Sequence, residues 1–222
     1  MNLDFYLSVL VIAGPSLFCQ IEQNDRYISD RHNSGFCREI SNSFECARAI
    51  EKTVLPNIPG AHRQSRLLRL MMRDGSTVRF EDKKDSNSYS LRGLFLRDFY
   101  VVEVQEIEGG HFQILQFDTG NSIETIGPPI ASPSENLFIT ANVDVDAAYT
   151  ANGIELWAIK QNKPVFLTAY SGPCGPDGAK WKSQDTIQFH CVCFPPDSIP
   201  ACNTTVTLSA KKKNWGQDSP LY

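Results

Sequence analysis

The sequence predicts a mainly β protein, an antiparallel meander preceded by one N-terminal helix. Three observations support this fold class. A helical period of apolar residues occurs only over residues 42–55, and the period changes to two from about residue 65. Turn signals then separate about ten short strand candidates. No regular alternation of strands and helices, which would indicate a parallel sheet, follows. The frame is expected to be a partial or small propeller-like array, or a sandwich.

The helix has clear start and stop signals. Asn42 is expected to be its N-cap, with Glu45 three residues later in the capping-box pattern. Pro56 ends it, because proline lacks an amide hydrogen and restricts the preceding residue. One apolar stripe recurs at spacings of three and four: Phe44, Ala47, Ile50 and Val54.

Hairpins begin in the stretch RLLRLMMRDGSTVRFED, where apolar residues alternate on both sides of Asp74-Gly75. This dipeptide predicts a two-residue type I′ turn with positive φ at both positions. Gly109-Gly110 predicts a second hairpin, and Thr119-Gly120 a further turn. The remaining strand candidates are Ile123–Ile126, Leu137–Val143, Ile154–Lys160, Val165–Tyr170, Thr186–Cys193 and Thr205–Ala210. Together they form one domain over 42–222, with the β body at 65–210 and a tail at 211–222.

Two resemblances accompany this pattern. The segment SPSENLFITANVDVDAAYTANGIELWAIK resembles a blade of a β-propeller protein, with a Ser-Pro turn and a strand carrying Trp157. More widely, the Cys-Ala-x-x-Ile-Glu-Lys helix at 46–52, followed by a β-meander, resembles a set of uncharacterised exported bacterial proteins. That resemblance implies an exported single-domain β protein. It implies no activity and therefore no catalytic residue.

The first nineteen residues, MNLDFYLSVLVIAGPSLFC, predict a signal peptide, since the apolar run from Phe5 to Cys19 is short for a membrane span. Asp4 lies where positive charge is usual. A lipid anchor on Cys19 is disfavoured, because the bulky Phe18 precedes it. Residues 20–41 are predicted to be a polar leader. The protein is therefore expected to be exported, periplasmic or extracellular, with no membrane span after removal of the signal.

The stretch HCVCFPPDSIPAC contains three of the seven cysteines. Cys191 and Cys193 lie on one face of a predicted strand, with α-carbons about 6.6 Å apart, which is unfavourable for a mutual disulfide. The geometrically favoured pairing joins Cys193 to Cys202 across the proline-rich loop. The same scheme pairs Cys174 with Cys191 and Cys37 with Cys46. Other pairings remain open.

Zinc is the alternative use of these cysteines. Cys174, Cys191, Cys193 and Cys202 could supply four thiolates, or His190 could replace one. The Cys-x-Cys spacing on a strand differs from the usual zinc knuckle, and His190 points to the opposite face. The sequence therefore favours disulfides, with no metal and no cofactor.

No recognised catalytic motif occurs, and the four histidines are far apart. Asp144 and Asp146 could share a face and bind calcium, although no EF-hand pattern surrounds them. Tyr149 and Trp157 are aromatic binding candidates, with core packing as the competing interpretation. The formal net charge of −4 argues against nucleic-acid binding.

The function that these observations favour is an exported, non-catalytic binding or scaffold module with an extracellular or periplasmic partner. Two alternatives remain: an exported hydrolase with a convergent, calcium-assisted site, and a zinc-stabilised intracellular protein. The sequence therefore favours a protein that is not an enzyme, because it contains no recognised catalytic motif.

Overall fold

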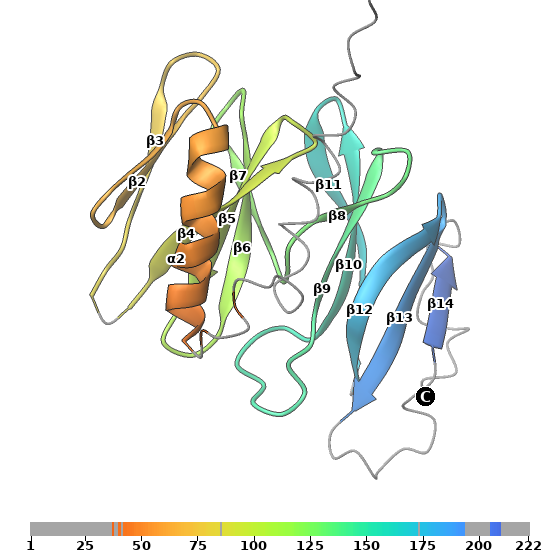
Figure 1. Cartoon of the computed structure of the whole chain (residues 1–222). Helices are drawn as coiled ribbons and strands as arrows, with labels where there is room; N and C mark the ends of the chain where they lie inside the picture. Colours follow the sequence, from red (N-terminus) through yellow and green to blue (C-terminus); the bar gives the residue numbers. More distant parts are fainter. Residues whose placement is uncertain are drawn as a thin grey trace, which may run out of the picture.

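Consecutive strands pair with one another in four antiparallel sheets that follow each other along the chain (Figure 1). The structure is a computed structural model and describes Cys37, Ile40, residues 42–84, 86–172 and 174–193, and the backbone of 205–209. The predicted signal peptide (1–19), most of the polar leader, Cys202 and the tail lie outside these residues. The mainly β meander with a single helix is confirmed within the described part of the chain.

The helix is α2 (Ser43–Val54), followed by a 3-10 turn, η2 (Leu55–Asn57). The first two sheets contain β1 (Ala61–Gln64), β2 (Leu67–Met71), β3 (Thr77–Glu81), then β4 (Ser88–Phe95), β5 (Phe99–Gln105), β6 (Gly110–Gln116) and β7 (Ser122–Thr125). The last two contain β8 (Ile130–Ala131), β9 (Leu137–Asn142), β10 (Gly153–Lys160), β11 (Lys163–Tyr170), then β12 (Cys174–Ser183), β13 (Thr186–Cys193) and β14 (Thr205–Ser209). We call them the first to fourth sheets.

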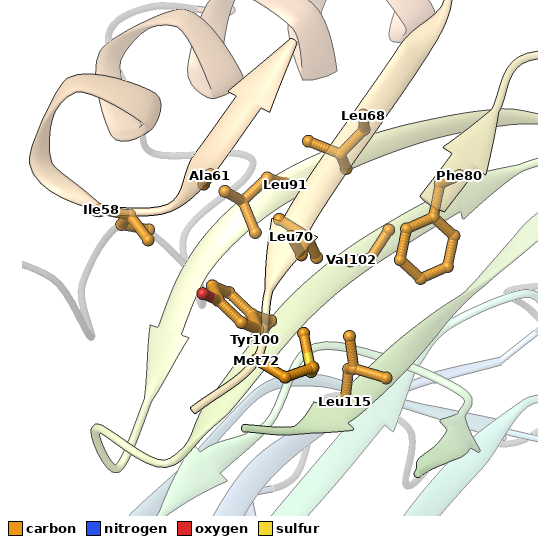
Figure 2. Packing of buried hydrophobic residues seen from close by; sticks show 10 residues of the cluster. All are labelled: Ile58, Ala61, Leu68, Leu70, Met72, Phe80, Leu91, Tyr100, Val102 and Leu115. Carbon is orange, nitrogen blue, oxygen red and sulfur yellow. The ribbon is translucent and has the colours of Figure 1, made fainter. Parts of the chain in front are cut away.

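The core divides into three apolar layers, one between each pair of successive sheets. Leu68 and Leu70 of the first sheet pack against Tyr100 and Val102 of the second (Figure 2). Phe138 and Trp157 of the third sheet join residues of the second sheet in another layer: Phe95, Phe99, Val101, Phe112 and Ile114. The third and fourth sheets enclose the remaining layer, which includes Ile154, Leu156, Ile187 and Phe189. The central strands of the second and third sheets are therefore covered on both faces.

Strand burial follows from this stacking. All seven residues of β5 are buried, because its two faces contact different sheets. In β13, by contrast, buried residues alternate with partly or fully exposed ones, as expected when one face packs on the core. Four strands were not predicted: β1, β4, β8 and β12. The glycines and proline at the start of β12 indicated a loop, and its pairing with β13 overrides that local preference.

Helix α2 begins as predicted, since the Asn42 Oδ1 accepts hydrogen bonds from the amides of Phe44 and Glu45 at 2.8 and 3.3 Å. The Asp74-Gly75 hairpin is also present, but the predicted two-residue turn is wrong. Met72 and Ser76 are joined by a backbone hydrogen bond, and only Gly75 of the pair has positive φ. Phe44, expected on the buried stripe, is 38% exposed.

A charged network attaches the helix to the edge of the second sheet. Glu51 is 2% exposed, and its carboxylate accepts hydrogen bonds from Arg48, from two nitrogens of Arg63 and from the Leu91 amide, all at 2.8–2.9 Å. Asp82 accepts from Arg63 and from the Tyr89 amide. The carbonyl of Tyr89 accepts from both arginines. The outward backbone groups of edge strand β4 at these positions are thus satisfied by side chains.

The cysteine pairing differs from the expected scheme. Cys37 is joined to Cys46, as in that scheme, but Cys174 is joined to Cys193. The pairs Cys193–Cys202 and Cys174–Cys191 are therefore wrong. The reason is the register of β12 and β13, which places Cys174 directly opposite Cys193 with α-carbons 4.2 Å apart, whereas Cys191 lies opposite Pro176. Cys191 is a buried free thiol.

Replacing Glu51 tests the role of the charged network. We expect Glu51→Gln to lower the free energy of unfolding by about 3 kcal/mol, because two partly buried arginines lose their shared counter-charge. Urea unfolding measures the change. Glu81→Gln, which removes an exposed carboxylate from β3, is the control and should change stability by less than about 0.5 kcal/mol. Equal effects of the two substitutions would contradict a structural role for the network.

Peptide mapping without reduction tests the disulfides. We expect fragments that link Cys37 to Cys46 and Cys174 to Cys193. Burial raises the pKa of the Cys191 thiol, so less thiolate forms at a given pH and alkylation of the native protein should be slow. Denaturant should abolish this protection. A Cys193–Cys202 fragment would contradict the Cys174–Cys193 disulfide.

Candidate functional site

A cleft lies where the core between the second and third sheets ends. Its walls come mainly from three separate parts of the chain: the first turn of α2, the β5–β6 hairpin and the loop between β9 and β10. Its volume is about 340 Å³, within the range of small-ligand sites. A second cavity of about 300 Å³ shares six lining residues with it: Glu106, Gly110, His111, Ile126, Tyr149 and Thr150. The two cavities therefore adjoin each other, and we call them together the hairpin cleft.

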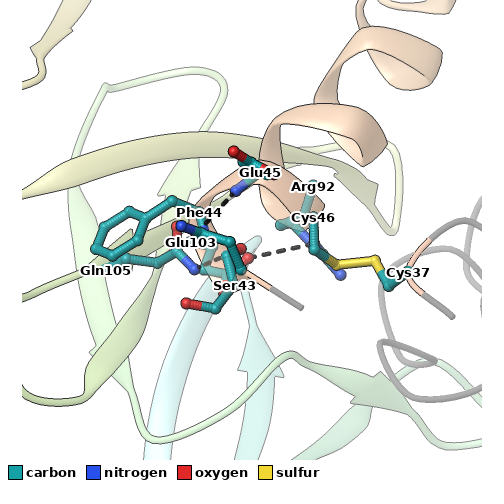
Figure 3. Close-up of a disulfide and its surroundings, with 9 residues drawn as sticks. Cys37, Ser43, Phe44, Glu45, Cys46, Arg92, Glu103 and Gln105 are labelled. Atoms are coloured by element: carbon teal, nitrogen blue, oxygen red, sulfur yellow. Dashed lines mark hydrogen bonds and ion pairs between the residues drawn. A yellow bond between two sulfur atoms is a disulfide. The ribbon is translucent and has the colours of Figure 1, made fainter. Parts of the chain in front are cut away.

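The floor of the hairpin cleft contains buried polar side chains near the start of α2 (Figure 3). Glu103 lies on β5 and forms an ion pair with Arg92 at 3.2 Å, and both side chains are almost fully buried. Arg92 lies in a β-bulge between Leu91 and Gly93. Two residues along β5, the Gln105 Nε2 donates to the Ser43 carbonyl at 3.0 Å. These contacts tie the first turn of the helix to the floor.

The loop between β9 and β10 is ordered by its own polar side chains. The Asp144 carboxylate accepts hydrogen bonds from the amides of Ala148 and Thr150 and from the Thr150 hydroxyl, at 2.6–2.9 Å. Asn142 donates to the Thr150 hydroxyl and to the Ala151 carbonyl. Burial of Asp144 acts to raise its pKa, but the hydrogen bonds from Thr150, Ala148 and the Tyr149 backbone prevail and hold the pKa below its ordinary value.

Gly109 allows this loop to approach the β5–β6 turn. It has φ of +92°, and a Cβ atom there would lie 2.5 Å from the Thr150 Cγ2. A larger residue would therefore separate the two walls of the cleft. The Gly-Gly dipeptide predicted as a turn thus also sets the width of the site.

Exposed apolar side chains are concentrated around the hairpin cleft. Among the described residues, seven large apolar side chains are exposed, and four of them line the hairpin cleft. They come from all three walls: Phe44 of α2, Ile107 of the hairpin, and Val143 and Tyr149 of the loop. Ile107 is 74% exposed and Tyr149 60%. Exposed apolar groups that gather in one place mark an interaction site more often than scattered ones.

The predicted site residues separate in the structure. Asp144 and Tyr149 line the cleft, whereas the exposed Asp146 does not. Trp157 is 9% exposed and belongs to the core, stacked on Phe138 with ring centroids 5.9 Å apart. The sequence interpretation missed Phe44, Ile107 and Val143. Ile107 and Val143 could have been recognised as apolar residues within an otherwise polar turn or strand end.

The arrangement of acidic groups does not form a metal centre in the described residues, where no group of three potential ligands converges. Glu155 is in contact with neighbours: its Oε2 accepts from the Thr140 hydroxyl at 2.7 Å and from the Trp157 indole at 3.2 Å. His111 lies with its Nε2 3.9 Å from the Glu124 carboxylate. The disulfide also removes Cys174 and Cys193 from the thiolate set that a zinc site would need.

Comparison with family models, with curated proteins and with solved structures finds no significant match to this chain. Among the described residues, no helix is both long enough and apolar enough to cross a membrane.

Substitution of Asp144 tests whether this carboxylate holds the loop. We expect Asp144→Asn to increase hydrogen exchange at the amides of Ala148 and Thr150, with Asp146→Asn as the control that leaves exchange unchanged. Because the folded-state pKa of Asp144 is lowered, its contribution is present above the usual carboxyl pKa, near pH 4, and is lost as the pH falls below it. After correction for the pH dependence of intrinsic exchange, the protection factors of these amides in the unsubstituted protein should therefore fall in acid. Identical exchange in both variants would contradict this role.

Proposed function

We propose that the protein is an exported, non-catalytic binding module that takes apolar side chains of a protein partner into the hairpin cleft. The observation that carries this proposal is the convergence of Phe44, Ile107, Val143 and Tyr149 at one depression. Apolar and aromatic anchors that fill pockets dominate the energy of protein interfaces. The hairpin cleft is such a pocket, and it is formed by three segments of the chain.

The acidic residues of the cleft support binding rather than hydrolysis. Asp144, the carboxylate that the calcium-assisted alternative requires, is engaged by its own loop through three hydrogen bonds. Asp146 does not line the cleft beside it. Asp144 and Asp146 are therefore not arranged to share a cation, and Asp144 has a structural role in its loop.

Export is part of the proposal. The disulfides Cys37–Cys46 and Cys174–Cys193 are of the kind that persists in oxidising compartments. The N-terminal apolar stretch agrees with such a location. The partner is accordingly expected in the periplasm or outside the cell.

Photo-crosslinking in the native host tests the proposal. Tyr149 is replaced by p-benzoylphenylalanine, and the same residue is placed at Phe166 as the control. Phe166 is 51% exposed on β11 and lines neither cavity. We expect a discrete cross-linked partner from position 149 only. Adding Ile107→Ser should reduce that product about tenfold, because a buried aliphatic contact is lost. Equal products from both positions, or none from position 149, would contradict the proposal.

A further inference from the structure

The walls of the hairpin cleft carry carboxylates without lysine or arginine. Acidic side chains occur in both cavities: Glu103, Glu106, Glu124, Asp144 and Glu155. His111 is the one basic residue type among the described lining residues. Glu103 is balanced by Arg92 beneath the floor, and the carboxylates of Asp144 and Glu155 accept hydrogen bonds from neighbouring residues. Glu106 and Glu124 are exposed at the mouth and give it a negative charge.

The cleft also contains a hydrogen-bond acceptor that lacks a donor. Gln105 lies in the floor and is 5% exposed, and its Nε2 donates a hydrogen bond to the Ser43 carbonyl. Its Oε1 is buried and has no hydrogen-bond partner. Without a donor, the partial negative charge of this oxygen is uncompensated and adds to that of the carboxylates. The negative charge of this oxygen and of the carboxylates favours a ligand group that is a positively charged hydrogen-bond donor.

The apolar rim fits the same type of ligand. Tyr149 exposes its aromatic ring beside the two cavities. Aromatic faces attract ammonium and guanidinium groups, and they also pack against the aliphatic stems of such side chains. Phe44 and Ile107 provide apolar contact on the other two walls. A purely apolar ligand would leave the carboxylates unused, and an anionic one would be repelled.

We infer that the partner presents a positively charged amine or guanidinium group directly beside an apolar side chain, and that Glu106 and Glu124 select this charge. The inference rests on the proposed function and specifies the chemistry of its partner. The apolar side chain of the partner packs against the apolar residues of the rim. Its cation interacts with Glu106 and Glu124, and this interaction distinguishes it from neutral and anionic ligands. Such exposed charge pairs contribute modestly to affinity and depend on salt.

Three small probes with one phenyl ring and different head groups test the inference on the full chain. They are phenethylammonium, 2-phenylethanol and 3-phenylpropionate, titrated into ¹⁵N-labelled protein while the amides of Ile107, Val143 and Thr150 are followed. At low salt we expect the ammonium probe to bind about fivefold more tightly than the alcohol, with the carboxylate weakest. Added sodium chloride should reduce this difference.

Charge-neutral variants assign the effect to named residues. Glu106→Gln combined with Glu124→Gln should bring the affinity for phenethylammonium down to that for the alcohol. Glu108→Gln is the matched control, since it removes an exposed carboxylate from the same turn but does not line the cleft. Its affinities should equal those of the unsubstituted protein.

The outcomes separate this inference from the proposed function. Equal affinities for the three probes, all shifting the cleft amides, would overturn the selection of a cation and leave the apolar binding site intact. A similar loss in the Glu108→Gln control would also overturn it, because the effect would then be general charge. No shift at the cleft amides with any probe, together with no cross-link from position 149, would overturn the proposed function itself.

Discussion

The buried carboxylate of Glu51 holds together the parts of the molecule that adjoin it. Glu51 lies on α2, and its carboxylate accepts hydrogen bonds from Arg48 of the same helix, from Arg63 of β1 and from the Leu91 amide of β4. An edge strand exposes backbone donors and acceptors that invite pairing with another chain. Here the charged side chains satisfy those groups on β4, and the helix covers the edge. A buried ionic group of this kind is stable because every charge has a partner and the carboxylate has four donors.

From this protected edge the molecule extends as a series of stacked sheets. A sheet covered on one face alternates apolar and polar residues, whereas a sheet covered on both faces reads as a continuous apolar run. Strand β5 (FYVVEVQ) is of the second kind, and β13 (TIQFHCVC) is of the first. The polar residues Glu103 and Gln105 within β5 are therefore exceptional, and they mark the point where the apolar layer ends and the hairpin cleft begins.

The site was only partly accessible from the sequence. Asp144 and Tyr149 were recognised as candidates, and both line the cleft, but the pattern gave no reason to separate them from Asp146 or Trp157. An aromatic side chain is expected to pack against other groups, but its type does not show whether it packs in the core or binds a partner at the surface. Trp157 lies on strand β10, between two apolar layers, and is buried, whereas Tyr149 lies on the loop between β9 and β10 and is exposed.

Local patterns in the sequence specify the helix and most of the strands. Asn42 and Pro56 bound the helix, and two-residue periodicity identifies most strands, because capping and burial act between residues close in the chain. The cysteine partners and the cleft, in contrast, arise from the packing of the sheets. Cys174 meets Cys193 through the β12–β13 register, and the first turn of α2, the β5–β6 turn and the β9–β10 loop converge only when the sheets stack. Both depend on contacts between distant segments, which no local pattern encodes.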